Sequence, residues 1–332
     1  MEQKYQTIIL KKQPKIISSY AIVGPKEGQG NFARYFDYVM KNDCFGEKTF
    51  EKAERKMMET AITGVIEKAH LAAKDVDLLI SGDLLNQIIS SSYAARAFQF
   101  PFLGVYGACS TMAESIAVAS VLVDGGYFEN VVCCTGSHFS TAERQYRFPL
   151  ELGNQRPPTS QWTVTGAGGC VLSLNGEGPR ITRVTLGKVV DWGINDVNNM
   201  GAAMAPAARD TLLAHFRNTK TTPEDYDLIL TGDLGKLGSE ILIDLMDDEG
   251  ITLGRNYGDC GQMYYRREQK TLCGGSGAGC CATVFNSYVM AKIKDGTYKK
   301  VLFLPTGALL STTSSQQGET IPGVCHAVVI EN

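Results

Sequence analysis

Several features that would direct this chain to a particular class of protein are scarce or absent. The sequence has only two tryptophans and four histidines in 332 residues. It has no run of about 18 apolar residues, the length that crosses a membrane as a helix. The net charge is −3, so the basic surplus of a non-specific nucleic-acid binder is missing. The segment Met1–Pro14 is polar and carries lysines, and we therefore expect no signal peptide.

Metal and disulfide patterns are also missing, although the chain has ten cysteines. No Cys-x-x-Cys motif occurs, and the histidines do not cluster with cysteines at the spacing of zinc ligands. Without an expected signal peptide, reduced thiols are the better interpretation. The 44% of hydrophobic residues and 20% of charged residues are ordinary for a globular protein with a large core.

Internal repetition is the most informative feature that is present. The segment Asp75–Leu84, DVDLLISGDL, reappears as DYDLILTGDL in Asp225–Leu234. Each copy reads as an acidic turn, a short apolar strand, and a Gly-Asp pair at the carboxyl end of the strand. A second match aligns the turn before Cys109 with the turn before Cys280, and each turn opens an apolar helix. Three matches in the same order argue for duplication, the third being between Ala167–Leu174 and Gly323–Ile330.

The repeat also divides the chain. We expect an N-terminal half over residues 1–175 and a C-terminal half over residues 176–332. The second half has extra residues, which we expect in the polar stretch Asp247–Thr271 as an exposed excursion over a cleft.

Helices alternate with strands in both halves. The segment Lys48–Ala69 has apolar residues three to four apart and leads into the apolar strand Leu78–Ser81. In the second half, Thr211–Asn218 leads in the same way into Leu228–Thr231. Continuous apolar strands between helices indicate an α/β fold, with mostly parallel sheets covered on both faces.

One cysteine lies where chemistry is expected. A strand through Phe100–Tyr106 runs directly into Gly-Ala-Cys-Ser, and a helix begins there. This places Cys109 at the amino end of a helix, where the dipole and the free N–H groups stabilise a thiolate or hold a carboxylate. A small buried cysteine without a role is the alternative, and it is the one we favour for Cys280. The glycine-rich loop Leu272–Gly279 either cradles an anion or allows tight packing.

Together, the Gly-Ala-Cys-Ser turn, the duplicated strands and the glycine-rich turn resemble the thiolase superfamily over nearly the whole chain. This resemblance implies a thiolase-like fold, in which two duplicated α/β halves form a five-layer αβαβα sandwich. Within the superfamily, the sequence is similar to the stage V sporulation protein AD family of spore-forming bacteria. That similarity runs from KIISSY at Lys15 to CHAVVI at Cys325.

The chain departs from the condensing enzymes of this fold at two positions. Those enzymes place a histidine just after the second-half repeat strand, where this sequence has Gly232 and Asp233. They place a second histidine or asparagine at the start of the glycine-rich turn, where this sequence has Leu272–Gly274. Such groups polarise a thioester carbonyl, so we expect no catalytic residues and no enzyme. A residual acyltransferase or thioesterase of the ketoacyl synthase type using Cys109 is the alternative, and a scaffold for membrane partners is a third hypothesis.

The resemblance implies a binding protein for dipicolinic acid (pyridine-2,6-dicarboxylate), alone or as its calcium chelate. The family supports uptake of this compound into the forespore during sporulation and its release at germination. It works with membrane proteins of the same operon at the spore inner membrane. The resemblance therefore implies a peripheral membrane location, no cofactor and no resident metal. A homodimer stays open, because thiolase-fold enzymes commonly dimerise.

We expect the ligand contacts at the cysteine turn and in loops that follow strands. Arginines in these loops would pair with an anionic ligand, although solvated loop arginines are the alternative. The two strand-end aspartates would meet calcium carried by the ligand, or else cap the following turn. The predicted set is Cys109, Ser110, His138, Ser140, Arg144, Arg147, Asp83, Asp233, Thr312, Thr313 and Ser314.

Overall fold

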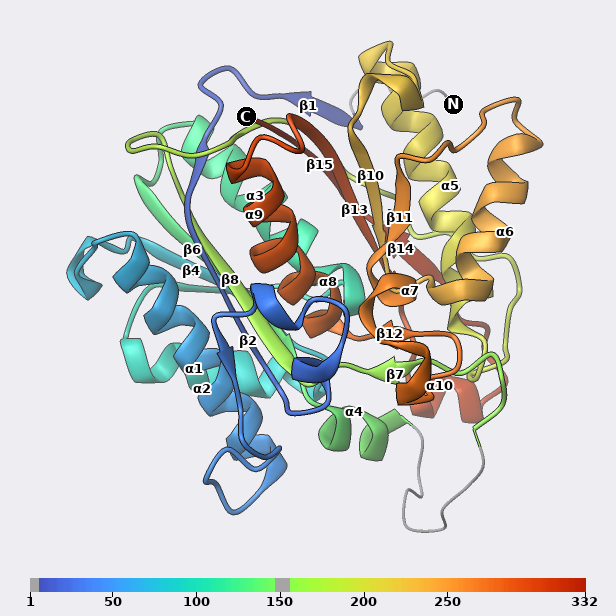
Figure 1. Ribbon diagram of the computed structural model, residues 1–332, viewed down its shortest axis with the longest axis horizontal. Coiled ribbons are helices and arrows are strands. Elements are labelled where there is room, and N and C mark those ends of the chain that lie inside the picture. Colours follow the sequence, from blue (N-terminus) through green and yellow to red (C-terminus); the bar gives the residue numbers. More distant parts are fainter. Residues whose placement is uncertain (1–5, 147–155) are drawn as a thin grey trace.

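The computed structural model describes residues 6–146 and 156–332, and it shows two sheets with helices between and outside them (Figure 1). The strands of the two sheets are hydrogen-bonded in the order β11-β10-β13-β15-β9-β2-β8-β6-β4-β5. The two sheets are joined between β2 and β9 by one residue pair, Lys15 and Arg180. The first sheet consists of β2 (Lys15–Val23), β4 (Leu78–Gly82), β5 (Phe102–Gly104), β6 (Asn130–Ser137) and β8 (Gly166–Ser173). The second consists of β9 (Arg180–Thr185), β10 (Leu228–Gly232), β11 (Tyr257–Asp259), β13 (Lys300–Ala308) and β15 (Ala327–Glu331).

Short strands extend these sheets at their margins. β3 pairs with β2, β1 with β9 and β14 with β13, while β7 and β12 form a separate small ladder. Their bounds are β1 (Thr7–Ile9), β3 (Tyr38–Val39), β7 (Trp162–Thr163), β12 (Gly275–Ser276) and β14 (Gly323–Cys325).

The strand order confirms the duplication. In the first half β4 lies parallel to both β5 and β6, and β8 lies antiparallel to both β6 and β2. In the second half β10, β11, β13, β15 and β9 repeat these relations in the same order. The expectation of mostly parallel sheets was too simple, because each sheet mixes both directions.

Helices complete the five layers. α1 (Phe50–Lys68) and α2 (Ile89–Phe98) cover the outer face of the first sheet, and α5 (Met200–Thr219) and α6 (Gly235–Asp247) cover that of the second (Figure 1). Between the sheets lie α3 (Thr111–Asp124), α8 (Ala278–Val284) and α9 (Met290–Lys294), the last two joined by the π-helical turn Phe285–Val289. The remaining helices, α4 (Phe139–Tyr146), α7 (Cys260–Tyr264) and α10 (Thr312–Gln316), lie toward the carboxyl ends of the parallel strands.

Helix α1 forms where the periodicity predicts it. Thr49 caps its amino end, accepting a hydrogen bond from the backbone N–H of Lys52 with 3.3 Å between the atoms. Its buried face includes Met57, Ala61 and Val65, which follow each other at the spacing of three to four residues that predicts the helix. The burial of this face against the first sheet is the main source of its stability, since isolated helices are marginal in water.

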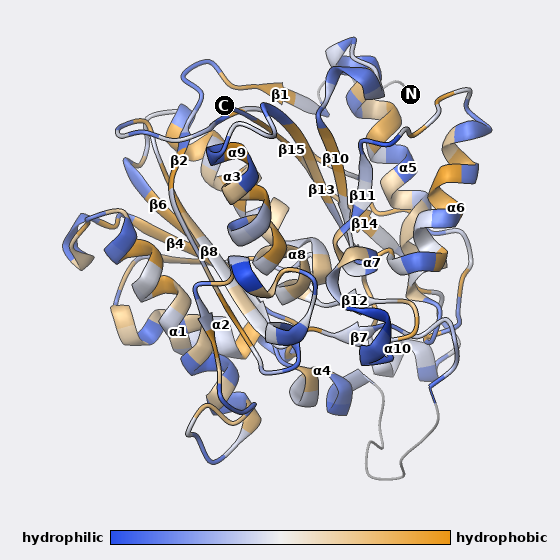
Figure 2. Cartoon of the chain, in the orientation of Figure 1, coloured by the Kyte–Doolittle hydropathy of each residue, from blue (hydrophilic) through white to orange (hydrophobic). Residues whose placement is uncertain are grey.

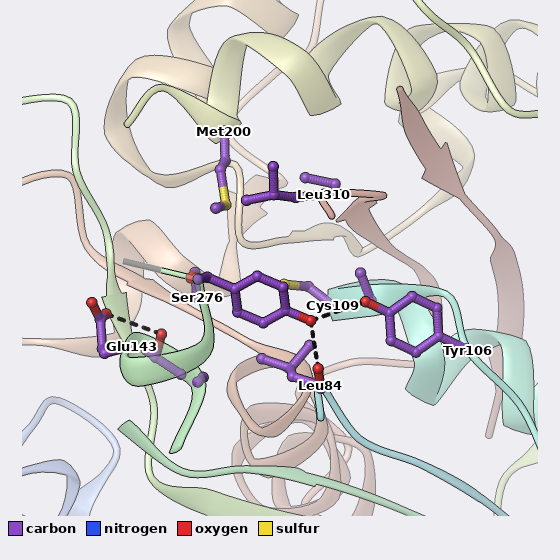
Figure 3. A pocket seen from close by; sticks show the side chains of 12 residues that line it. Leu84, Tyr106, Cys109, Glu143, Met200, Ser276 and Leu310 are labelled. Atoms are coloured by element: carbon purple, nitrogen blue, oxygen red, sulfur yellow. Dashed lines mark hydrogen bonds between the residues drawn. The ribbon is translucent and has the colours of Figure 1, made fainter. Parts of the chain in front are cut away.

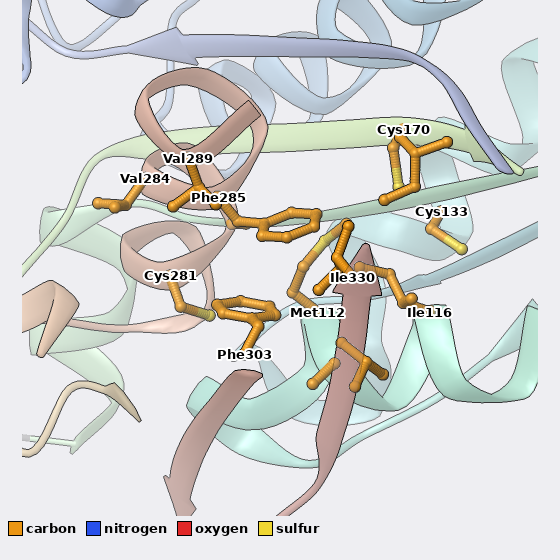
Figure 4. Close-up of a cluster of buried hydrophobic side chains, with 14 of the residues drawn as sticks. Met112, Ile116, Cys133, Cys170, Cys281, Val284, Phe285, Val289, Phe303 and Ile330 are labelled. Carbon is orange, nitrogen blue, oxygen red and sulfur yellow. The ribbon is translucent and has the colours of Figure 1, made fainter. Parts of the chain in front are cut away.

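The core between the sheets is apolar. Hydrophobic residues concentrate in the strands and central helices, and hydrophilic ones lie at the periphery (Figure 2). Phe285 and Phe303 stack with ring centroids 4.5 Å apart, and Met112 and Ile116 of α3 are fully buried in the same cluster (Figure 4). Each such side chain contributes about 1.5–3 kcal/mol by leaving water.

The extra residues of the second half, which we expect as an exposed excursion, are exposed only in part. They lie between β11 and α8, and they include α7, whose Tyr264 is fully buried. The Tyr264 hydroxyl lies 2.9 Å from the hydroxyl of Thr283. The expectation fails for α7 because it weighed the polar composition of the stretch and overlooked its aromatic residues. Within residues 6–146 and 156–332, no helix has the length and apolar character that crossing a membrane requires.

Candidate functional site

The cysteine turn is a tight bend between β5 and α3. Ala108 has a φ of 49°, a left-handed conformation that most residues avoid. The bend is fixed by hydrogen bonds from Ser110 Oγ to the Gly107 carbonyl at 2.7 Å and from Thr111 Oγ1 to the Ala108 carbonyl at 2.6 Å. Cys109 is buried, with 7% of its surface exposed. The sequence therefore placed this residue correctly at the amino end of a helix.

A small cavity lies in front of Cys109 (Figure 3). Its volume is about 40 Å³, and its walls come from both halves of the chain. Most of the wall is apolar, and the polar atoms come from two tyrosines, a glutamate, a threonine and a serine. The lining residues are Leu84, Tyr106, Ala108, Cys109, Ala142, Glu143, Tyr146, Thr163, Met200, Ser276, Ala308 and Leu310.

The Cys109 thiol is held in its protonated form. Burial is the largest cause, and it raises the pKa of the thiol well above its usual range. The nearby carboxyl group of Asp233 raises the pKa further. Such a thiol is a poor nucleophile, because the thiolate is the reactive form.

Asp233 lies next to Cys109 but outside the cavity wall. It follows β10 with a φ of 63°, its side chain is fully buried, and it is not among the residues that line the cavity. Burial raises the pKa of its carboxyl well above the ordinary value, and the thiols of Cys280 and Cys109 oppose that shift. The position just after β10 is therefore occupied by a buried acid with two thiol neighbours.

Glu143 contributes an acidic group to the cavity wall. Its carboxylate forms an ion pair with Arg156 at 2.7 Å and accepts a hydrogen bond from Thr163 Oγ1 at 3.3 Å. The guanidinium of Arg156 also lies over the stacked rings of Phe139 and Trp162. This cluster fixes the carboxylate and compensates its charge, so that it can be buried at 1% exposure.

A larger groove adjoins the cavity. It has a volume of about 490 Å³ and shares four wall residues with the cavity, namely Leu84, Tyr106, Tyr146 and Leu310. The other residues that line it are Leu85, Asn86, Gln87, Ile88, Gly104, Val105, Gln145, Leu309, Ser311, Thr312 and Thr313. We call the first space the cavity and the second the outer groove.

Three of the predicted ligand residues lie on these spaces. Cys109 lines the cavity, and Thr312 and Thr313 line the outer groove. Ser314 belongs to the same helix, α10, where its backbone N–H bonds Ser311 Oγ at 3.4 Å. Arg147 lies outside the described residues.

Two further predicted ligand residues, Asp83 after β4 and Ser110 in the cysteine turn, form hydrogen bonds within the fold and do not face the cavity. Asp83 accepts hydrogen bonds from the backbone N–H of Leu85 at 2.9 Å and from the N–H and hydroxyl of Ser91 at 2.7 Å. It therefore caps a turn, which was the alternative that we left open. The hydroxyl of Ser110 is engaged within the cysteine turn, as described above. Neither side chain lines the cavity.

The predicted residues around α4 also lie off the cavity wall. His138 Nε2 bonds the Asp43 carbonyl at 2.9 Å, and its Nδ1 accepts from the backbone N–H of Ser140 at 3.1 Å. Burial lowers the pKa of His138, so its ring is neutral. Arg144 forms an exposed ion pair with Glu51. Their roles as ligand contacts stay predictions, for which this arrangement gives no support.

Several wall residues were not predicted from sequence. Tyr106 adjoins the Gly-Ala-Cys-Ser motif, and Ser276 lies in the glycine-rich loop that we considered as an anion cradle. Attention to motif neighbours would have found these two. Glu143, Tyr146 and Met200 have no local signal, because only the packing of α4 and α5 against the cysteine turn brings them to the cavity.

The glycine-rich loop serves close packing. A Cβ on Gly279 would lie 2.3 Å from the Gly166 carbonyl oxygen, and one on Gly277 would lie 2.7 Å from Ser137 Oγ. Over the described ranges, the structure shows no cluster of three or more His, Cys, Asp or Glu side chains that could hold a metal ion.

Two solved structures show a similar fold. The 3-oxoacyl-[acyl-carrier-protein] synthase III from Aquifex aeolicus VF5 matches 96% of this chain and 100% of its own, with a TM-score of 0.59 and 13% identity. OleA from Xanthomonas campestris matches 98% of this chain and 99% of its own, with a TM-score of 0.63 and 13% identity. At this identity, the similarity confirms the thiolase-like fold and nothing more.

Sequence comparison is far more specific. The family model for stage V sporulation protein AD matches residues 4–331. The stage V sporulation protein AD of Bacillus subtilis (strain 168) is 44% identical over 326 residues, which cover 98% of this chain and 96% of that protein. This chain belongs to the stage V sporulation protein AD family.

Proposed function

We propose that this chain is a non-catalytic binding protein for dipicolinic acid or its calcium chelate. In this role it supports uptake of the ligand into the forespore during sporulation and its release at germination. Membership of a sporulation family gives the chain a role in sporulation. The ligand and the steps of its transport are the parts that we propose.

The state of Cys109 carries the proposal. The chain keeps the fold and the cysteine turn of condensing enzymes, together with a cavity in front of the sulfur. By the resemblance it lacks their histidine, and the raised pKa of Cys109 leaves a protonated thiol beside the buried carboxyl of Asp233, whose pKa is also raised. Such a site can accommodate a small molecule, while its thiol is held in the form that is a poor nucleophile.

The walls suit a flat aromatic acid. Apolar side chains and two tyrosine rings would contact the pyridine ring, and the hydroxyl group of Ser276 lies on the wall as a hydrogen-bond donor. Cys109 itself lies in the turn at the amino end of α3, where the helix dipole favours a carboxylate. These groups match a ligand that is apolar on its faces and anionic at its edge.

The cavity alone is too small for dipicolinate, but the cavity and the outer groove together have room for it. A cavity of about 150 Å³ is known to hold benzene, whereas the cavity here measures about 40 Å³. The adjoining groove of about 490 Å³ is ample for a single ring with two carboxylates. The ligand would therefore extend from the outer groove toward Cys109.

We propose further that the chain reaches the forespore or spore inner membrane peripherally, through membrane proteins encoded in the same operon. A partner of this kind accounts for membrane association by a chain whose described helices are not suited to cross a membrane. A homodimer is compatible with the proposal and is not required by it.

Calorimetric titration with dipicolinate, with and without calcium, tests the proposal. We expect saturable binding that survives Cys109→Ala and is lost in Cys109→Trp, because the larger side chain fills the cavity. Cys44→Ala, at the exposed cysteine, is the matched control and should bind like the unmodified protein. Absence of binding in both conditions by a folded protein would contradict the proposal. Turnover of an acyl-coenzyme A that depends on Cys109 would instead establish the acyltransferase alternative.

A further inference from the structure

The cavity and the outer groove are separated by a chain of hydrogen bonds. The hydroxyl groups of Tyr106 and Tyr146 lie 3.2 Å apart, and the Tyr146 hydroxyl donates to the Leu84 carbonyl at 2.5 Å (Figure 3). All three residues line both spaces. The partition thus consists of two phenol rings that meet through their hydroxyl groups and are fastened to the backbone of the loop that follows β4.

The same loop is fastened a second time by α4. Gln145 Nε2 donates to the Leu84 carbonyl at 3.1 Å, and Gln145 Oε1 accepts from the backbone N–H of Asn86 at 3.1 Å. Gln145 and Tyr146 are the last two residues of α4. The end of one helix therefore holds both the partition and the wall of the outer groove.

The fastened loop is conformationally strained. Gln87 has φ 60° and ψ 21°, and Ile88 has φ 47° and ψ 49°. Two consecutive non-glycine residues in the left-handed region are unusual, and a β-branched residue is the least suited to it. The strain is maintained by packing, since a Cβ on Gly104 would lie 2.3 Å from Ile88 Cδ1. Strain of this kind persists only where the surroundings enforce it, and it is concentrated at ligand clamps and switches.

We propose that Tyr106, Tyr146 and the Leu84 carbonyl form a tyrosine gate, which must open before any ligand passes from the outer groove to Cys109. Opening breaks the two hydrogen bonds of the Tyr146 hydroxyl, to Tyr106 and to the Leu84 carbonyl. It also lets Gln87 and Ile88 relax toward ordinary backbone conformations. Binding then has two steps, a fast encounter in the outer groove and a slower isomerisation that opens the gate. The gate itself depends only on these contacts, whereas its role in dipicolinate binding rests on the proposed function.

Modification of Cys109 by iodoacetamide measures gate opening without reference to dipicolinate. Because Cys109 lines the cavity and not the outer groove, the proposal predicts that the folded protein reacts there only while the gate is open. Tyr146→Phe removes two hydrogen bonds, so we expect Cys109 to react ~10-fold faster or more. Tyr127→Phe, at a tyrosine with 76% of its surface exposed, is the matched control and should leave the rate unchanged.

Buried cysteines in the sheet distinguish opening of the gate from a loosened fold. Cys133 and Cys170 face each other on β6 and β8 and are fully buried. Mass spectrometry of each labelled peptide should show Cys109 accelerated by Tyr146→Phe while these two stay unreactive. Equal rates at Cys109 in Tyr146→Phe and the unmodified protein would overturn the gate. A parallel acceleration at Cys133 and Cys170 would also overturn it, since the substitution would then act through global unfolding.

A second variant tests the gate in the opposite direction. Asparagine tolerates the left-handed region better than glutamine, so Gln87→Asn stabilises the closed loop. We expect Cys109 to react a few-fold more slowly in this variant, and the slow phase of dipicolinate binding in stopped-flow fluorescence to slow by the same factor. Unchanged labelling in Gln87→Asn would show that the strain is unrelated to opening. Altered labelling with no dipicolinate binding in any variant would retain the gate and reject the ligand.

Discussion

The thiol of Cys281 donates a hydrogen bond to the backbone carbonyl of Cys109, with 3.1 Å between sulfur and oxygen. The donor belongs to α8 of the second half and the acceptor to the cysteine turn of the first. Both groups are buried between the sheets. The bend that presents Cys109 to the cavity is therefore fixed partly by the opposite half of the molecule.

Substitution of Cys281 tests the importance of that contact. Cys281→Ala removes the sulfur and leaves the Cys109 carbonyl without this donor, and we expect it to lower the free energy of unfolding by about 1–3 kcal/mol. Cys281→Ser restores a donor and should be less destabilising. Urea unfolding followed by circular dichroism measures the difference. If both variants lose the same free energy of unfolding, then the packing of the sulfur, and not its hydrogen bond, is what stabilises the protein.

The raised pKa of Cys109 predicts an unusual alkylation profile. At neutral pH, iodoacetamide should modify the exposed Cys44 readily and Cys109 very slowly, since burial keeps the Cys109 pKa well above its usual range. The rate at Cys109 should still be rising at pH 9, where an ordinary thiol begins to level off. Peptide mapping at several pH values measures both rates. Preferential modification of Cys109 at pH 7 would contradict the non-catalytic proposal.

Glu27 predicts a dependence of stability on pH. Burial raises the pKa of its carboxyl from 4.5 to about 7 in the folded protein, where it accepts hydrogen bonds from Tyr265 and Thr165. The folded state therefore holds the proton more tightly than the unfolded state. This contribution to stability is complete below pH 4.5 and is lost as the pH rises to about 7, at about 1.4 kcal/mol per pH unit.

Replacement of Glu27 isolates this contribution. Glu27→Gln keeps the shape and an acceptor oxygen but cannot ionise, so its free energy of unfolding should fall less between pH 5 and pH 8. Denaturant titrations of both proteins at pH 5 and pH 8 show how much the free energy of unfolding changes with pH in each protein. The same pH dependence in both proteins would show that Glu27 keeps an ordinary pKa in the folded state.

The fold could be predicted further than the site because repetition is visible in the sequence. The two copies of the Gly-Asp strand gave β4 and β10, and the aligned cysteine turns gave the starts of α3 and α8. The position of Cys109 followed from local chemistry alone, since a strand, a Gly-Ala-Cys-Ser turn and a helix are contiguous.

Contacts between distant segments could not be predicted in the same way. Asp83 and Asp233 occupy the same position in the repeat, yet the first caps a turn and the second faces two thiols. Nothing in the repeated motif distinguishes them. Tyr146 reaches the cavity only because α4 packs beside the cysteine turn, and that packing depends on side chains far apart in the chain.

Gly307 provides a final test, of how closely the two halves approach at the site. A Cβ at this position of β13 would lie 2.0 Å from the Gly107 carbonyl oxygen, a contact that backbone atoms must move to relieve. We expect Gly307→Ala to lower the free energy of unfolding by about 1–3 kcal/mol. It should also weaken ligand binding, because the displaced carbonyl belongs to the turn that carries Cys109. Gly254→Ala is the control, since Gly254 is exposed and its nearest contact is Asn256 Oδ1 at 3.2 Å. If both variants unfold at the same denaturant concentration and bind equally well, then the two halves are not held as tightly against each other as this contact requires.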